Sequence, residues 1–334
     1  MQADQTQNRT APTKVLFDTD PGVDDAMALL FLQHHPAIDL IGVTTVHGNA
    51  HIDVTTRNAL YLCERFGIEV PVARGARHPL LQYKAEPPTF VHGDDGLGNV
   101  GLSFEPTRQA DDRPAYRLII DTLRQHPGEV TLVAVGPLTN LALAVKEDPE
   151  IAQLVREVVI MGGAFGVNGQ GGNVTPVAEA NIIGDPHAAD IVCTAPWPVT
   201  LVGLDVTHQV LMSNDLFGQL RDRGGSHGQF MWDISRFYVD FYSSREQIPG
   251  CYVHDSSAVA YVIDPTLFEV RRGPVRVVDS GIAIGQTVQQ PDDRSYAPGP
   301  WDGYPSQNVC VAVDAPRLLQ LFMDTFVPTA AAAR

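Results

Sequence analysis

The chain has 334 residues, of which 44% are hydrophobic, and its formal net charge at pH 7 is −16. This length and composition are sufficient to bury the core of one large α/β domain. The negative charge argues against nucleic acid or an anionic membrane surface as a partner, because both repel an acidic protein.

The spacing of the cysteines and the N-terminal segment indicate in which cellular compartment the protein is expected. The cysteines are widely spaced without a CxxC pair, which favours buried, reduced thiols over a disulfide framework. They are Cys63, Cys193, Cys251 and Cys310. No apolar run approaches the roughly 18 residues of a membrane span. Residues 1–13 are polar and lack the apolar region of a signal peptide, so we expect a disordered lead-in and a cytoplasmic protein.

Strand and helix patterns alternate through the first two-thirds of the chain. Strands are predicted at 14–17, 39–46, 70–73, 130–135, 158–161 and 199–204. Helices are predicted at 26–32, 51–66, 114–125, 136–145 and 185–194. Alternation of this kind, with nearly continuous Val, Ile and Leu in the strands, predicts an α/β fold with a mainly parallel open sheet flanked by helices.

The last third adds helices and returns to strands, and no linker or repeat divides it from the rest. Helices are predicted at 212–223, 228–244, 254–263 and 316–326, and strands at 275–278 and 309–313. We therefore expect one domain over residues 14–330. The three longest loops, 74–112, 162–184 and 279–308, follow strand ends. Ligands bind at the carboxyl ends of the strands in open α/β sheets, so we expect polar residues there to form one site.

Four aspartates fall within eight residues where the first strand turns into the first helix. They are Asp18, Asp20, Asp24 and Asp25. The helix dipole favours an acid in the first turn of a helix, which explains one or two of them. Carboxylates this close repel one another unless a positive charge lies between them, and a hard divalent cation prefers oxygen ligands. The cluster therefore predicts a metal site.

Three further segments are weak signals when each is taken alone. Asp255 begins an apolar helix and has the position of a simple N-cap. Residues 172–181 carry two amides and a carboxylate in what could be a solvated loop, and His92 begins what could be an ordinary glycine turn.

Together these segments resemble the nucleoside hydrolase family, the inosine–uridine-preferring nucleoside N-ribohydrolases. The resemblance spans about residues 14–265. In the family's order it is carried by DTDPGVDD (18–25), TTVHGN (44–49), HGDDG (92–96), VGPLTN (135–140), NVTPVAEAN (173–181) and HD (254–255).

The resemblance implies a Rossmann-like core and a specific set of site residues. The implied ligands of a Ca²⁺ ion are Asp20, Asp24, Asp25, Asp255 and the backbone carbonyl of Val135. The implied ribose contacts are Asn49, Met161, Asn173, Glu179 and Asn181, with Asn173 and Glu179 near the 5′-hydroxyl and with His92 and His254 on the nucleobase side. Asp18 is expected to hold the geometry of the cluster without binding the ion directly. The family also implies a homodimer or homotetramer.

The chemistry of N-glycosidic bond hydrolysis independently requires residues of these types. Positive charge develops on the ribose, as in an oxocarbenium-like transition state. A metal that binds the sugar diol lowers the pKa of a bound water, and Asp20 is positioned to accept that proton. The departing base must be protonated or hydrogen-bonded, which suits the imidazole of His254.

The chain departs from the family pattern in the sugar loop and at the last motif. Ala180 lies between Glu179 and Asn181, where many members have an aromatic residue, which leaves the nucleoside preference open. Ser256 replaces a frequent proline. Aromatic residues of 232–242 could contact the base, Tyr238 and Tyr242 more than Phe237 and Phe241, which fit core packing at helical spacing.

Two other functions remain as alternatives. Haloacid dehalogenase-type Mg²⁺ phosphohydrolases also carry Asp-x-Asp after a first strand, although here the acidic pair follows immediately and the Asn/Glu loop suits hydroxyls. A non-catalytic Ca²⁺-dependent nucleoside or sugar binder would need the same residues. An EF-hand is excluded, because position twelve counted from Asp18 or Asp20 is Leu29 or Phe31 instead of Glu.

Overall fold

The computed structural model describes residues 11–81 and 86–327. Thr13 begins the first strand, so the predicted lead-in over residues 1–13 reaches one residue too far, and residues 1–10 of it lie outside the described residues. The predicted end of the domain at residue 330 also lies outside them.

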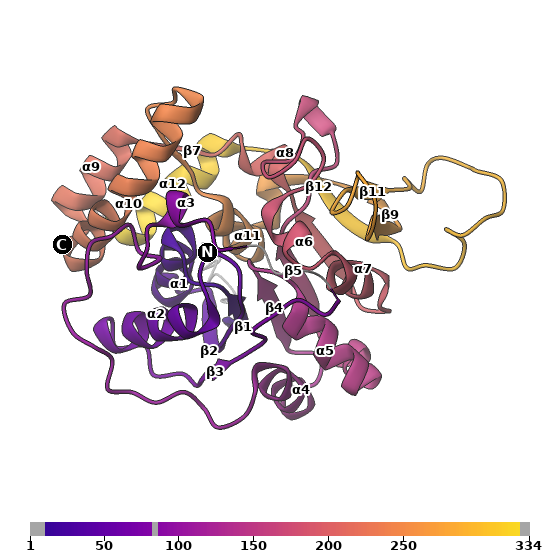
Figure 1. Ribbon diagram of the computed structural model, residues 1–334, viewed down its shortest axis with the longest axis horizontal. Helices are drawn as coiled ribbons and strands as arrows, with labels where there is room; N and C mark the ends of the chain where they lie inside the picture. Colours follow the sequence, from indigo (N-terminus) through magenta and orange to yellow (C-terminus); the bar gives the residue numbers. More distant parts are fainter. Residues whose placement is uncertain (1–10, 82–85, 328–334) are drawn as a thin grey trace, which may run out of the picture.

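An eight-stranded sheet forms the centre of the molecule (Figure 1). Its strands are β1 (Thr13–Thr19), β2 (Ile38–Thr45), β3 (Val72–Arg74), β4 (Val130–Ala134), β5 (Glu157–Met161), β6 (Val199–Val202), β9 (Phe268–Gly273) and β12 (Gln307–Val313). Their order is β3-β2-β1-β4-β5-β6-β12-β9, and all neighbours are parallel except β9, which pairs antiparallel with β12. The chain runs outward in both directions from the β1–β4 pair, which makes the carboxyl ends of these two strands the topological switch point.

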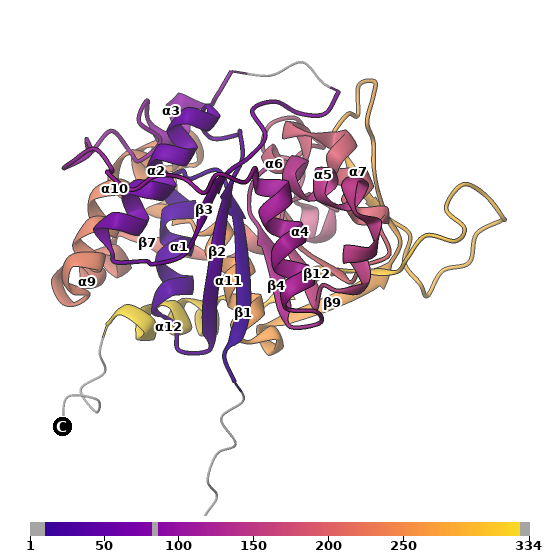
Figure 2. The same ribbon diagram turned by 90° about the horizontal axis from the view of Figure 1, so that it is seen from below.

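Helices cover both faces of the sheet (Figure 2). On one face the sheet packs against α1 (Val23–His34), α2 (Ile52–Arg65) and α11 (His254–Ile263). The same core extends outward to α9 (Asn214–Arg223), α10 (Gly225–Glu246) and α12 (Ala315–Phe326), which pack on these helices or on one another. The other face packs against α4 (Ala115–Gln125), α5 (Thr139–Glu147) and α7 (Pro186–Thr194). Side chains alternate along each strand, so Val15 and Phe17 enter the first core and Leu16 the second. The predicted mainly parallel α/β sheet is confirmed.

Local residues determine where helix α1 begins and ends, and neighbouring elements bury it. Asp25 accepts a hydrogen bond from the backbone N–H of Gly22, the N-cap, at 3.0 Å. The helix ends at His34, since His35 precedes a proline and adopts an extended conformation. Nearly all of α1 is buried between the sheet and α10, α11 and α12, so its first turn is held rigidly.

Several short elements were not predicted, because they lack enough residues to show a period. They are α3 (Thr89–His92), α6 (Ala180–Gly184), α8 (Leu204–Thr207), β7 (Leu211–Ser213), β8 (Gly250–Tyr252) and β11 (Thr287–Gln289), with 3₁₀ turns η1 (Pro149–Gln153), η2 (Val167–Gly169) and η3 (Pro265–Leu267). Strand β9 is longer and was also not predicted, because charged residues interrupt its apolar ones. The helix expected from residue 212 starts at Asn214, because β7 pairs antiparallel with β8. The strand expected at 275–278 is β10 (Val275–Val277), which pairs with β11 outside the main sheet.

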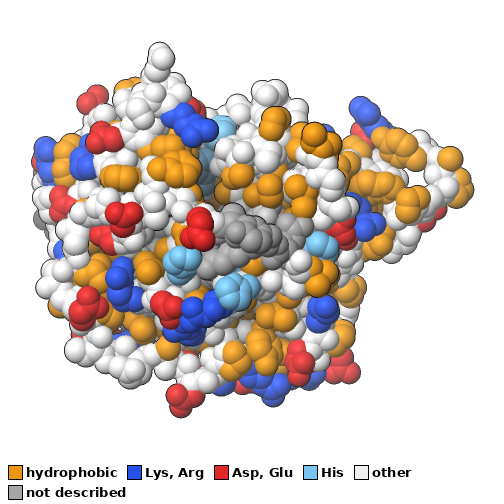
Figure 3. Space-filling model, in the orientation of Figure 1, with side chains coloured by type: hydrophobic (Ala, Val, Ile, Leu, Met, Phe, Trp, Pro, Cys, Tyr) orange, Lys and Arg blue, Asp and Glu red, His pale blue; other side chains and the backbone are white. Residues whose placement is uncertain are grey.

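The cysteines, the helices and the molecular surface can each be compared with the expectations drawn from composition. All four cysteines are buried and unpaired. Within residues 11–81 and 86–327, no helix combines the length and apolarity needed to cross a membrane. On the face drawn in Figure 3, acidic and basic side chains are interspersed among neutral and apolar ones. The segment between β11 and β12 projects from the body as a long arm (Figure 1).

Candidate active site

Two helices far apart in the sequence bring three carboxylates together at the switch point. Asp24 and Asp25 lie in the first turn of α1, and Asp255 lies in the first turn of α11. Each offers an oxygen within 4.8 Å of the other two, and all three side chains are buried. The expected convergence of Asp255 with the acidic cluster is therefore confirmed for these three residues.

Burial and mutual repulsion raise the pKa values of these carboxyl groups. Burial, followed by the charge of Asp25, raises the pKa of Asp24 to about 8. Burial and the charges of Asp24, Asp25 and Asp20 raise the pKa of Asp255 well above its usual range. Each carboxylate therefore disfavours ionisation of the others, and a buried, unpaired charge is strongly destabilising.

Asp20 adds a fourth carboxylate beside the cluster. Its Oδ2 accepts the backbone N–H of Asn49 at 2.7 Å, whereas Oδ1 is buried without a hydrogen-bond partner among the described residues. A Cβ atom on Gly48 would lie 1.9 Å from Oδ2, so only glycine fits there. An all-oxygen donor set with an orphaned buried oxygen fits a hard divalent cation.

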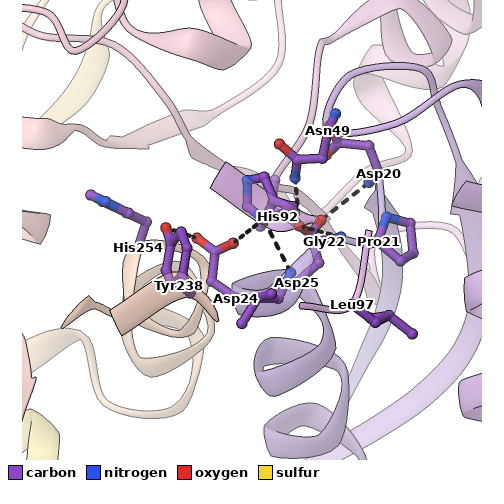
Figure 4. Close-up of polar contacts among 12 residues, drawn as sticks. Asp20, Pro21, Gly22, Asp24, Asp25, Asn49, His92, Leu97, Tyr238 and His254 are labelled. Atoms are coloured by element: carbon purple, nitrogen blue, oxygen red, sulfur yellow. Dashed lines mark hydrogen bonds and ion pairs between the residues drawn. The ribbon is translucent and has the colours of Figure 1, made fainter. Parts of the chain in front are cut away.

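Neighbouring groups hold Asp25 in a fixed orientation. Thr19 Oγ1 donates to its Oδ1 at 2.5 Å, and Asn49 Nδ2 donates to its Oδ2 at 2.9 Å. Asn49 therefore bridges Asp20 and Asp25, as Figure 4 shows. Such a bridge fixes the carboxylates before any ion binds.

Asp18 lies outside the group of three convergent carboxylates. Its Oδ1 accepts Thr44 Oγ1 at 2.5 Å and Asn140 Nδ2 at 2.7 Å, and burial raises its pKa to about 7. Asn140 Nδ2 also donates to the carbonyl of Thr45 at 2.9 Å. The position of Asp18 is consistent with a supporting role.

Asn181 joins the ends of two central strands. Its Nδ2 donates to the carbonyl oxygen of Val135, just after β4, at 2.8 Å and to that of Met161, at the end of β5, at 3.1 Å. A carbonyl oxygen has two lone pairs, so the Val135 oxygen can still accept a second partner.

Glu179 and Asn173 occupy different positions around α6. The buried carboxylate of Glu179 caps α6, accepting Asn181 N–H at 2.8 Å and Ile182 N–H at 3.0 Å. It also accepts Gly163 N–H at 3.0 Å. Asn173 is exposed, and its Oδ1 accepts the backbone N–H of Ala180 at 3.0 Å. Glu179 is thus built into the strand ends, whereas Asn173 lies at the rim.

His92 is a neutral imidazole with a defined tautomer. Its Nδ1 accepts the backbone N–H of Val23 at 3.2 Å, so the ring hydrogen lies on Nε2. Burial lowers the pKa of His92 to about 3. The ring stacks on Tyr238 with centroids 5.3 Å apart, and its Nδ1 lies 4.0 Å from Asp24 Oδ1 (Figure 4).

A chain of hydrogen bonds connects Asp24 to His254. Tyr238 donates to Asp24 Oδ2 at 3.3 Å, which leaves the Tyr238 oxygen to accept from Tyr242 at 3.4 Å. The Tyr242 oxygen then accepts His254 Nε2–H at 2.9 Å, and His254 Nδ1 accepts from Thr207 Oγ1 at 2.8 Å. Burial lowers the pKa of His254 well below its usual value, so the ring is neutral at pH 7.

The sequence indicated most of these residues, but gave no role to two threonines that bond to site residues. Tyr238 and Tyr242 are buried and bonded to site residues, while Phe237 and Phe241 are only half-buried and Phe241 packs on Phe90. Thr19 lies inside the DTDPGVDD motif without a role assigned to it, and Thr207 lies in no motif. Only the fold places their hydroxyl groups beside Asp25 and His254.

Comparisons with known proteins agree on one family. The model of the family described as inosine-uridine preferring nucleoside hydrolase matches residues 15–320. A relative from Oryza sativa subsp. japonica, named probable uridine nucleosidase 1, is 42% identical over 92% of this chain and 94% of its own length. A solved plant nucleoside hydrolase superposes with a TM-score of 0.89 and 39% identity, over 95% of this chain and all of the other. A purine-preferring ribonucleoside hydrolase from Gardnerella vaginalis superposes with a TM-score of 0.86 and 36% identity, over 94% of this chain and 98% of the other.

The raised pKa of Asp24 predicts how the stability of the metal-free protein depends on pH. Its folded value of about 8 exceeds the usual 3.8, so between these values the folded state binds a proton that the unfolded state has lost. The free energy of unfolding should therefore fall as pH rises from 5 to 8. Thermal melts in EDTA at several pH values measure this.

Calcium and an Asp24→Asn variant provide the controls. Saturating Ca²⁺ should raise the melting temperature most at pH 8, because the ion replaces the bound protons. Asp24→Asn should show a weaker pH dependence in EDTA than the parent. A melting temperature in EDTA that rises from pH 5 to 8 would contradict the assignment of a proton-binding acidic cluster.

Proposed function

The chain belongs to the inosine-uridine preferring nucleoside hydrolase family, and we propose that it hydrolyses uridine with a Ca²⁺ ion in the carboxylate cluster. It is a ribonucleoside N-ribohydrolase, which cleaves the N-glycosidic bond to give ribose and the free base. The observation that carries the calcium proposal is the convergence of Asp24, Asp25 and Asp255 beside the unpaired oxygen of Asp20.

The proposed calcium ligands are all oxygen atoms. They are the carboxylates of Asp20, Asp24, Asp25 and Asp255 and the carbonyl of Val135. Calcium takes six to eight oxygen ligands, so this set leaves room for sugar hydroxyls and a water. The bound ion would supply a fixed positive charge that orients the ribose and makes a water easier to deprotonate.

Asp20 is the proposed general base. Its Oδ2 is held by Asn49, and this leaves Oδ1 as the atom that accepts the proton of the attacking water. In the absence of the ion, burial and the charges of Asp25 and Asp24 raise the pKa of Asp20.

The ribose is proposed to lie between the two amides and Glu179. Asn49 and Asn181 are already bonded to Asp25 and to the strand ends, so their remaining polar atoms have fixed directions. The buried Glu179 lies near the 5′ side, Asn173 is at the rim and Met161 forms the floor. Fixed polar groups around the sugar favour the oxocarbenium-like transition state, because no reorganisation is needed as charge develops.

The leaving base is proposed to meet a hydroxyl and imidazole pair instead of a charged acid. A neutral His254 that lost its Nε2 proton would become an imidazolate, so we propose that the pair donates a hydrogen bond to the departing base through the Tyr242 hydroxyl. The base then takes its proton from water after the bond has broken. The Nε2–H of His92 is directed away from Val23 and can donate to a carbonyl oxygen of the base.

Uridine is proposed as the preferred substrate because relatives at 41–42% identity are named uridine nucleosidases. A purine nucleoside such as inosine is the second candidate, given the purine-preferring relative from Gardnerella vaginalis. We also propose a homodimer or homotetramer in the cytoplasm. Four buried, unpaired thiols support a reducing compartment, and light scattering at micromolar concentration tests the assembly.

Release of reducing sugar from nucleosides tests the function. With Ca²⁺ and without phosphate, uridine should release ribose faster than inosine, and EDTA should abolish the reaction. Hydrolysis of p-nitrophenyl phosphate with Mg²⁺ would instead indicate a phosphohydrolase. Ca²⁺-dependent nucleoside binding without ribose release would indicate a binding protein.

Asp20→Asn should lose nearly all turnover, since it removes the base and a ligand charge together. Glu179→Gln is the milder change, because it keeps an oxygen for the backbone donors of α6. It should raise KM and lower kcat only partly, as expected for a group that positions the sugar. Steady-state kinetics on uridine separate the two, and full activity of Asp20→Asn would refute the assignment of the base.

His254→Ala and Tyr242→Phe should slow uridine cleavage by about 10²–10⁴-fold, the usual cost of losing general-acid assistance to a leaving group. Both variants should act almost normally on p-nitrophenyl riboside, because nitrophenolate leaves without protonation. Equal losses on the two substrates would mean that the pair supports the metal site or the sugar, because Tyr242 is connected to Asp24 through Tyr238.

A further inference from the structure

His208 is an aromatic side chain with an unassigned role beside the site. It directly follows α8, and its Nδ1 lies 2.9 Å from Oε1 of Gln170. An amide oxygen only accepts hydrogen bonds, so Nδ1 carries the hydrogen. The ring stacks on Tyr252 with centroids 4.6 Å apart and an interplanar angle of 24°. Burial lowers the pKa of His208 to about 4, so it is neutral at pH 7.

Gln170 belongs to a glycine-rich segment, residues 166–172, that leaves the end of β5 and passes through η2. Gly166 and Gly169 have φ values of 74° and 77°, and a Cβ atom on either would meet no atom within 4 Å. The segment therefore packs loosely at both points. Its far end packs closely, because a Cβ atom on Gly171 would lie 2.6 Å from the carbonyl oxygen of Pro176. Between Gly166 and Gly169 the position of the segment depends on hydrogen bonds.

Helix α8 provides most of those bonds. The carboxylate of Asp205 accepts Phe165 N–H at 2.8 Å and Val167 N–H at 2.6 Å, which fix the beginning of the segment. Asn168 Nδ2 donates to the carbonyl of Val311 at 3.1 Å. The bond between Gln170 and His208 is the next attachment along the chain, and beyond it Gly172 N–H donates to the carbonyl of Pro176 at 3.2 Å.

The segment connects two parts of the proposed ribose side. Before it, Gly163 N–H donates to Glu179, and after it comes Asn173, which binds the first turn of α6. Movement of residues 166–172 would therefore disturb both ends of the sugar loop.

We propose that His208 and Gln170 form a latch that holds residues 166–172 against α8 and orders the ribose side of the site before substrate binds. This inference rests on the proposed function for its kinetic consequence. Both residues are positioning residues. A loop that is already ordered loses less conformational entropy when the sugar binds, so the latch should act on KM.

Two matched variants remove the bond and keep the shape. His208→Phe retains a ring that can stack on Tyr252, and Gln170→Met retains the side-chain length without the oxygen. Each should raise KM about threefold to tenfold, the size expected for one neutral hydrogen bond. The rise should be equal for uridine and p-nitrophenyl riboside, which share the ribose, and kcat should change by less than about twofold.

Three comparisons make the test specific. The double variant should be no worse than either single variant, because both remove the same bond. His208→Asn, whose amide NH₂ can take the place of Nδ1–H, should recover part of the lost affinity. Gln320→Met on the exposed face of α12 should leave KM unchanged.

Amide hydrogen exchange tests the latch by a measurement that does not depend on catalytic turnover. In the Ca²⁺-loaded protein without substrate, amides of residues 166–172 should exchange faster in His208→Phe and Gln170→Met than in the parent. Unchanged exchange and unchanged KM would overturn the latch, as would a loss confined to kcat on uridine, which would place His208 on the nucleobase side. If the parent hydrolyses no nucleoside, the proposed function fails and the exchange rates alone decide on the latch.

Discussion

Repulsion among buried carboxylates is the constraint on which the rest of the site depends. Asp24, Asp25 and Asp255 are brought together by the packing of α1 on α11, and neither helix can move away without opening the core. The hydrophobic core thus holds like charges at distances that they would not adopt alone. A cation removes this repulsion, so the energy stored in the packing becomes affinity for the ion.

The polar groups around the cluster are already connected before any ligand arrives. Asn49 bridges Asp20 and Asp25, Asn181 bridges the ends of β4 and β5, and the tyrosines of α10 connect Asp24 to His254. Each bridge crosses between different elements of the fold. The site is therefore a property of the whole sheet edge, and its geometry is set by backbone topology more than by any one loop.

The main features of the fold and the acidic half of the site could be predicted from the sequence, because both depend on local patterns. Near-continuous Val and Ile runs indicate buried parallel strands. The spacing of Asp20, Asp24 and Asp25 predicts that a strand ends, a turn follows and a helix begins there. The bond of Thr207 to His254 and that of Gln170 to His208 could not be predicted. Both depend on α8, a helix of four residues that is too short to show a period.

The distance in sequence between α1 and α11 has a consequence for synthesis on the ribosome. Asp24 and Asp25 emerge early, but Asp255 follows Asp25 by 230 residues, so the complete cation site cannot exist until most of the chain has been made. Before then, the early aspartates are an incomplete set that binds an ion weakly. A cation that needs the complete site would therefore be unable to nucleate folding of the nascent chain. Such an ion would join the first helix to a late one in the finished domain, and would be expected to slow unfolding more than it speeds folding.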